Sequence, residues 1–129
     1  MSPELTALAL ATLLQIAQIA LFAVLGNREL GVKYALSARD QGRVLSGYAA
    51  RAQRAMNNHF ESLSLFAIAA ILCHLSQASS HITALAGWAY LGSRILYVPA
   101  YIFALTPWRT IFWVIGLGAI CTLLGAALL

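Results

Sequence analysis

The sequence between residues 51 and 66 is RAQRAMNNHFESLSLF. Spacings of three, four and three separate its polar residues Arg51, Arg54, Asn58 and Glu61. On a helix this spacing places all four on one face, where a bundle helix normally carries its apolar seam. An almost purely apolar run follows at residues 63–75, so the stripe opens a membrane-spanning helix. Each charge inside a bilayer costs several kcal/mol, and such groups usually face the bundle interior and serve a function.

Composition assigns the whole chain to the membrane class. Its 129 residues are 61% hydrophobic and 9% charged, with a mean hydropathy of +0.80, whereas about a quarter of residues are charged in soluble proteins. The formal net charge is +4, but no soluble basic face remains, so we expect no nucleic-acid partner. Cys73 and Cys121 lie in apolar surroundings, which indicates small buried residues and predicts neither a disulfide framework nor a metal site.

Hydropathy predicts one membrane domain, residues 1–129, with four spans. We place the spans at about residues 5–25, 50–75, 82–105 and 110–129, and each is close to the roughly 20 residues that cross a bilayer. The first apolar stretch is too long for a signal peptide and no basic segment precedes it, so we interpret it as an uncleaved helix that ends at Gly26 and Asn27. The sequence therefore predicts an all-α integral membrane protein, a four-transmembrane-helix bundle.

Basic residues predict the orientation of this bundle. Five of them precede or begin the second span: Arg28, Lys33, Arg39, Arg43 and Arg51. The connection at residues 76–81 has no Lys or Arg. By the positive-inside rule the first connection and the turn at Arg109 are cytoplasmic, and both termini are exoplasmic. The short loops favour a bacterial cytoplasmic membrane as the location.

Two further groups of side chains carry expectations about packing. Gln15 and Gln18 share a face of the first span and predict hydrogen bonds between helices, in the bundle or in an oligomer. Three tryptophans lie towards span ends and are typical of interface anchors: Trp88, Trp108 and Trp113. Direct contact of the two glutamines with a ligand is the less favoured alternative, and the tryptophans do not indicate a cofactor site.

A second polar stripe lies in the third span. Arg94, Tyr97 and Tyr101 are spaced by three and four residues and so share one face. Counted from the cytoplasmic ends of two antiparallel spans, Glu61 and Arg94 both lie roughly 15 Å deep at about 1.5 Å per residue. We therefore predict an ion pair between them, because each charge offsets the desolvation of the other.

The same register predicts a polar cleft that opens to the cytoplasm. It sets Asn58 beside Tyr97 and Arg54 beside Tyr101, with Arg109 at the mouth. A fold-specifying ion pair and nothing more is one interpretation, but it leaves these groups unused. Surplus guanidinium groups favour a small anion. A peptide-like zwitterion such as glutathione supplies carboxylates and an ammonium group, and a guanidinium stabilises a reactive thiolate.

The two stripes together resemble the MAPEG family, the membrane-associated proteins of eicosanoid and glutathione metabolism. The matching motifs are R-x-x-R-x-x-x-N-x-x-E at 51–61, R-x-x-Y-x-x-x-Y at 94–101 and P-x-R at 107–109. The resemblance implies a homotrimer that binds glutathione between neighbouring subunits near the cytoplasmic face. It implies that glutathione is held by Arg51, Arg54, Asn58, Glu61, Arg94, Tyr97 and Tyr101. Arg39 is our candidate for a further arginine from the first connection.

What the resemblance implies about function is a glutathione-dependent membrane transferase or peroxidase acting on a hydrophobic electrophile, with Arg109 as the catalytic residue that stabilises the thiolate. The family includes members without catalysis, so the alternative is a lipid- or glutathione-binding scaffold of the same fold. A small four-span exporter is a third alternative. Such exporters carry their essential carboxylate in the first span, where this chain has only Glu4, at its edge.

Overall fold

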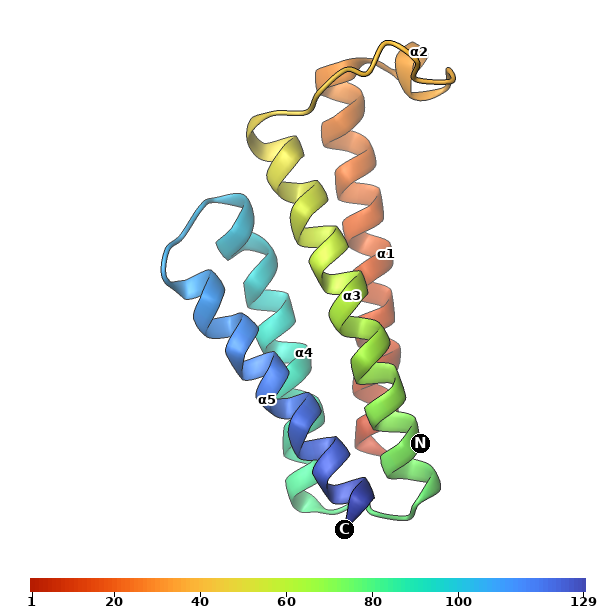
Figure 1. Cartoon of the computed structure of the whole chain (residues 1–129), viewed down its shortest axis with the longest axis vertical. Helices are drawn as coiled ribbons and strands as arrows, with labels where there is room; N and C mark the ends of the chain where they lie inside the picture. Colours follow the sequence, from red (N-terminus) through yellow and green to blue (C-terminus); the bar gives the residue numbers. More distant parts are fainter.

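Helical segments cover most of this apolar sequence. The computed structural model describes all residues 1–129, and its helices are α1 (Pro3–Leu30), α2 (Val32–Ala35), α3 (Gly47–Leu75), α4 (His81–Ile102) and α5 (Trp108–Leu128). The four long helices alternate in direction, so both termini lie at one end of the molecule and α2 lies at the other (Figure 1). The architecture is the predicted all-α antiparallel bundle.

Three of the long helices, α1, α3 and α5, are long and apolar enough to cross a membrane. The chain is thus a multi-pass integral membrane protein. Helix α4 has 22 residues and runs from the end where α3 finishes to the end where α5 begins (Figure 1). At about 1.5 Å per residue such a helix extends roughly 33 Å, close to the thickness of a hydrocarbon core. A fourth crossing by α4 stays a prediction.

Polar side chains fix the helix starts at the end with the termini. Ser2 accepts a hydrogen bond from the Leu5 N–H at 3.4 Å and so caps α1. Ser80 and Thr83 form a reciprocal capping box at the start of α4. Glu4 is only 1% exposed and accepts hydrogen bonds from the Ser79 and Thr83 hydroxyls. This carboxylate therefore fastens the first turn of α1 to the start of α4.

Helix α4 ends three residues before the predicted span end, at Ile102 and not at residue 105. Ala104 adopts a left-handed φ of 55°. The Leu105 N–H then donates to the Ala100 carbonyl at 2.8 Å, and the Ala104 N–H donates to the Tyr101 carbonyl at 3.1 Å. This is the Schellman pattern, which satisfies carbonyls left open at a helix end.

Helix α1 extends beyond its predicted end. Gly26 and Asn27, which we expected to form a turn, are helical, and α1 continues to Leu30 before Gly31 ends it with a φ of 90°. A glycine inside a helix costs only about 1 kcal/mol. The Gly31 N–H donates to the Asn27 carbonyl at 2.9 Å, so the helix projects past the bundle towards α2.

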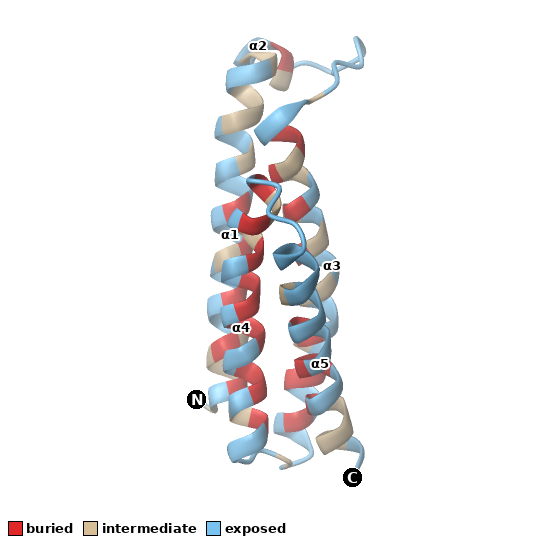
Figure 2. Ribbon diagram, turned by 90° about the vertical axis from the view of Figure 1, so that its left-hand side faces the viewer, coloured by how far each residue is buried: buried red, intermediate tan, exposed pale blue.

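The buried core lies in the half of the bundle that holds the termini. There the four long helices converge, whereas α4 and α5 diverge from α3 towards the other end (Figure 1), and buried positions follow the helix contacts (Figure 2). Phe66 and Tyr90 stack with ring centroids 3.9 Å apart. Small residues dominate and allow close helix approach. The core cluster consists of Ala7, Ala11, Phe66, Ala69, Ala70, Cys73, Ala86, Tyr90, Leu91, Ala119, Ile120 and Leu123.

Two expectations about packing are only partly right. Cys73 is buried as predicted, but Cys121 is exposed on α5, because its side of that apolar helix has no neighbour within the chain. Gln15 and Gln18 are buried at 7% and 4% exposure. The Gln15 Oε1 atom and both amide atoms of Gln18 have no hydrogen-bond partner, so the predicted bonds of these atoms do not form within the chain.

Substitution of Gly87 tests the close approach of α1 and α4. A Cβ atom there would lie 3.4 Å from the Glu4 Cα and 3.5 Å from the Ala7 Cβ, whereas a Cβ at Gly92 of the same helix meets nothing within 4 Å. We expect Gly87→Leu to destabilise the bundle by about 1–3 kcal/mol through overpacking. Thermal unfolding in detergent measures this, with Gly92→Leu as the matched control. Equal midpoints for the two variants would contradict the packing.

Candidate functional site

A groove between α3 on one side and α4 and α5 on the other holds three adjoining pockets of about 140, 270 and 230 Å³. Asn58 lines the first two, and Tyr101 and Arg109 line the second and third. We call these pockets together the polar cleft. Its lining contains eight of the predicted site residues: Arg51, Arg54, Asn58, Glu61, Arg94, Tyr97, Tyr101 and Arg109. Both predicted stripes therefore line the cleft from facing surfaces, as their helical spacing indicated.

Two arginines contact the Tyr101 ring near the mouth of the cleft. The Arg109 guanidinium carbon lies 4.7 Å from the Tyr101 ring centroid, and that of Arg54 lies 5.9 Å from it. The Arg54 Nε–H also donates to the Tyr101 hydroxyl at 3.2 Å, which confirms the predicted pairing of these two residues. Cation–π contacts stabilise two positive charges that would otherwise repel each other.

Arg51 joins α3 to the end of α4. Its Nε–H donates to the Ile102 carbonyl at 2.6 Å, and its guanidinium carbon lies 5.1 Å from the centroid of the Tyr48 ring. A cation is favourable at a helix C-terminus, where the carbonyl dipoles point outward. This contact sets the register of the two helices at the mouth.

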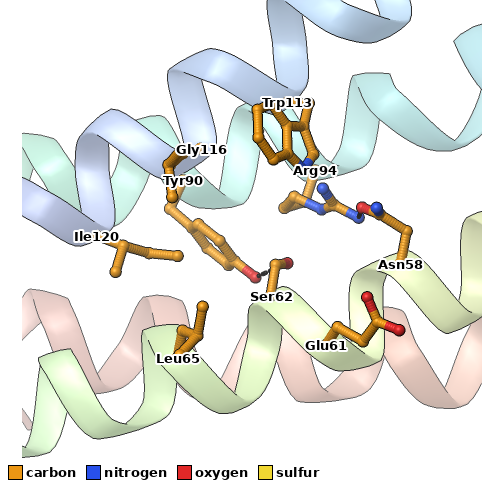
Figure 3. Close-up of a pocket in the computed structure, with 10 residues that line it drawn as sticks. Asn58, Glu61, Ser62, Leu65, Tyr90, Arg94, Trp113, Gly116 and Ile120 are labelled. Atoms are coloured by element: carbon orange, nitrogen blue, oxygen red, sulfur yellow. Dashed lines mark hydrogen bonds between the residues drawn. The ribbon is translucent and has the colours of Figure 1, made fainter.

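Arg94 does not form the predicted ion pair with Glu61. Its side chain is 1% exposed; Nη2 donates to the Asn58 Oδ1 at 3.0 Å and Nε donates to the His59 Nδ1 at 3.3 Å. The Tyr97 ring centroid lies 4.1 Å from its guanidinium carbon. Asn58 accordingly contacts Arg94 through its side chain, in place of the predicted Tyr97 pairing. Figure 3 shows the guanidinium beside Asn58 and the Glu61 carboxylate apart from both.

Arg94 does not reach Glu61 because α4 ends earlier than predicted, at Ile102. Arg51 contacts Ile102, Arg94 lies eight residues before Ile102, and His59 lies eight residues after Arg51. Counting from the true helix end therefore sets Arg94 level with His59. Glu61 lies deeper, is exposed on the bundle surface and makes no side-chain hydrogen bond within the chain. The error came from the assumed span end at residue 105.

The family model described as the MAPEG family matches residues 6–129. The chain belongs to the MAPEG family. This confirms the resemblance drawn from the two stripes, and the match covers α2 to α5 and all of α1 except its first three residues. MAPEG proteins typically bind glutathione and are typically trimeric membrane proteins. No curated protein and no solved structure matches the chain significantly.

Three residues that line the cleft of this MAPEG chain were not predicted from the sequence: Trp113, Ser62 and Tyr90. Trp113, which we expected to be an interface anchor, lines the first and second pockets. Its position four residues after Arg109 places it on the same face of α5, and that spacing was the available signal. Ser62 and Tyr90 lie at the deep end of the first pocket (Figure 3), with their hydroxyl oxygens 2.8 Å apart.

Arg39 lies in the connection between α2 and α3, away from the polar cleft of its own chain. Its Nε and Nη2 donate to the Ala35 carbonyl at 3.2 and 2.9 Å, and it lines none of the three pockets. A role for Arg39 in the site therefore requires a neighbouring chain and stays a prediction.

Proposed function

We propose that this MAPEG protein is a glutathione-dependent transferase or peroxidase that acts on a hydrophobic electrophile entering from the bilayer. The observation that carries the proposal is a cluster of arginines in one cleft without a carboxylate partner. Their hydrogen bonds within the chain go to a carbonyl, a hydroxyl, an amide oxygen and an imidazole nitrogen. Guanidinium groups that have no carboxylate partner within the chain favour the binding of carboxylates from a ligand. The cluster consists of Arg51, Arg54, Arg94 and Arg109.

The charges of glutathione match the charges of the cleft. Its two carboxylates suit Arg51 and Arg54 near the mouth and Arg94 deeper inside. Its ammonium group suits Glu61, the only acidic residue that lines the three pockets. In this arrangement Glu61 positions the ligand, and the neutral partners of the arginines leave guanidinium N–H groups free for it.

The proposed chemistry takes place beside Arg109. Its guanidinium stabilises the glutathione thiolate, which is the nucleophile. With an aryl halide, the sulfur forms a bond to the ring carbon and the halide leaves with the bonding electron pair. With a lipid hydroperoxide, two glutathione molecules are oxidised to the disulfide, and the hydroperoxide is reduced to an alcohol and water.

The assembly that we propose is a homotrimer of subunits with four spans, glutathione between neighbours and both termini exoplasmic. The basic first connection and Arg109 then face the cytoplasm, in a bacterial cytoplasmic membrane. The exposed Glu61 supports the assembly. A bare carboxylate near the bilayer midplane is costly, whereas a neighbouring subunit on this surface would cover it and could bring its own Arg39 to the site.

Glutathione titration of the purified protein tests the function. We expect glutathione to bind and to develop the ultraviolet absorbance of a thiolate. We also expect turnover of an aryl halide or a lipid hydroperoxide above the uncatalysed rate. Tight binding of glutathione with no turnover of either acceptor would contradict the enzyme and support the non-catalytic scaffold. No binding of glutathione at all would contradict the enzyme and the glutathione-binding scaffold, and would support a lipid-binding scaffold of the same fold.

A further inference from the structure

His59 is the only histidine in the interior of the bundle. It is 0% exposed, whereas His74 and His81 are exposed at helix ends. Both ring nitrogens have partners: Nε2 lies 2.9 Å from the Ala11 carbonyl oxygen of α1, and Nδ1 lies 3.3 Å from the Arg94 Nε of α4. His59 lies on α3, so its ring links α1 to α4.

The partners of this ring determine its tautomer. A backbone carbonyl only accepts hydrogen bonds, so the His59 Nε2 carries the proton and donates it to Ala11. The neutral ring then has a lone pair on Nδ1, which accepts the Nε–H of Arg94. Because the only ring proton is donated to Ala11, the His59 ring can accept a hydrogen bond from Arg94 but cannot donate one to it.

Three contacts consequently fix the Arg94 guanidinium. His59 holds its Nε–H and Asn58 accepts from Nη2, while the Tyr97 ring lies 4.1 Å from its carbon atom. A guanidinium has five N–H donors in one plane, and two are used here. The plane of the remaining donors is set before any ligand arrives, which reduces the entropy cost of binding.

We propose that His59 is a positioning residue for the ligand-binding Arg94, through a relay from the α1 backbone at Ala11. The proposal rests on the function proposed above, in which Arg94 receives a carboxylate of glutathione. It gives α1 a role in the site, although no residue of α1 lines the polar cleft. His59 does not touch the ligand and acts through the arginine alone.

Glutathione affinity of three variants tests the relay. His59→Phe keeps a planar aromatic ring but removes both hydrogen bonds, and we expect it to raise the Kd about tenfold, the effect of losing one hydrogen bond to a charged group. His59→Gln retains a donor and an acceptor and should recover most of the affinity. His74→Phe, the same change at an exposed position of α3, should leave the Kd unchanged.

A double-mutant cycle separates positioning from a merely structural role. Arg94→Lys lacks the Nε–H that His59 accepts, so His59→Phe should cause little further loss of glutathione affinity in that background. An equal loss of affinity in both backgrounds would overturn the proposal, because it would mean that His59 acts independently of Arg94.

A measurement without ligand distinguishes failure of this proposal from failure of the proposed function. In nitrogen-15 spectra of the free protein, the Arg94 Nε–H should exchange slowly with water in the wild type and in His74→Phe, and rapidly in His59→Phe. Rapid exchange in the wild type would overturn the relay. If the signal behaves as expected but the wild type does not bind glutathione, the relay stands and the glutathione function fails.

Discussion

Arg109→Ala is expected to lower kcat by about 10²–10³-fold, the usual effect of removing one preorganised group that stabilises developing or fixed negative charge. Arg109 contacts the Tyr101 ring, with its guanidinium carbon 4.7 Å from the centroid, and no side-chain hydrogen bond to the chain holds it. Its charge is therefore available to the thiolate. In the proposed arrangement other arginines hold the carboxylates, so we expect the glutathione Kd of this variant to change little.

Thiolate absorbance and calorimetric titration measure these two effects separately. The wild type should show the thiolate signal on adding glutathione, and Arg109→Ala should bind without it. Arg54→Ala is the matched control, because Arg54 contacts the same ring and donates to its hydroxyl; here we expect weaker binding with the thiolate signal preserved. A full thiolate signal in Arg109→Ala would contradict the assignment of Arg109.

The pH dependence of Arg109→Ala supplies a further expected result. Without the guanidinium, the pKa of the bound thiol should return towards the value of a free thiol, about 8.5. The thiolate is the form present above that pKa, so the residual rate should rise as pH increases from about 7 to 9. The wild-type rate should be nearly constant over the same range. Parallel pH profiles for the two proteins would show that Arg109 does not stabilise the thiolate.

Helical periodicity sufficed to predict that the two polar stripes share the cleft, because it depends only on spacing along one helix. Arg51 and Arg54, for example, reach the end of α4 and Tyr101 from one face of α3. Depth was harder to predict, since it requires the point where α4 ends. The left-handed residue there is Ala104, and without a glycine the sequence gives no sign of the helix end.

The contacts of His59 could not be predicted from the sequence, for a different reason. It is adjacent to Asn58, so on α3 it is turned about 100° from the polar stripe, towards α1. Its partner on α1 is the Ala11 carbonyl, a backbone atom that every residue carries and that no pattern of side chains identifies. Glu61 shows the reverse case: its place in the cleft followed from spacing, whereas the absence of a protein partner required the structure.

Glu61→Gln is expected to raise the glutathione Kd by about tenfold to a hundredfold, the effect of losing a hydrogen bond between charged groups. The stability of the protein should be unchanged. A broken buried ion pair costs about 3–5 kcal/mol, but Glu61 is exposed and makes no side-chain hydrogen bond within the chain. A raised Kd with unchanged stability therefore indicates a ligand-binding carboxylate, whereas a loss of stability indicates a fold-specifying partner of Arg94.

A glutathione analogue without the amino group makes this experiment specific to the ammonium. It should bind the wild type and Glu61→Gln equally, because the contact removed by the substitution is already missing in the analogue. Glu4→Ala should give the opposite pattern, since Glu4 is 1% exposed and accepts hydrogen bonds from Ser79 and Thr83: a lower unfolding midpoint with an unchanged Kd. If Glu61→Gln instead lowers the midpoint and weakens both ligands alike, Glu61 stabilises the fold or the assembly and does not bind the ammonium group.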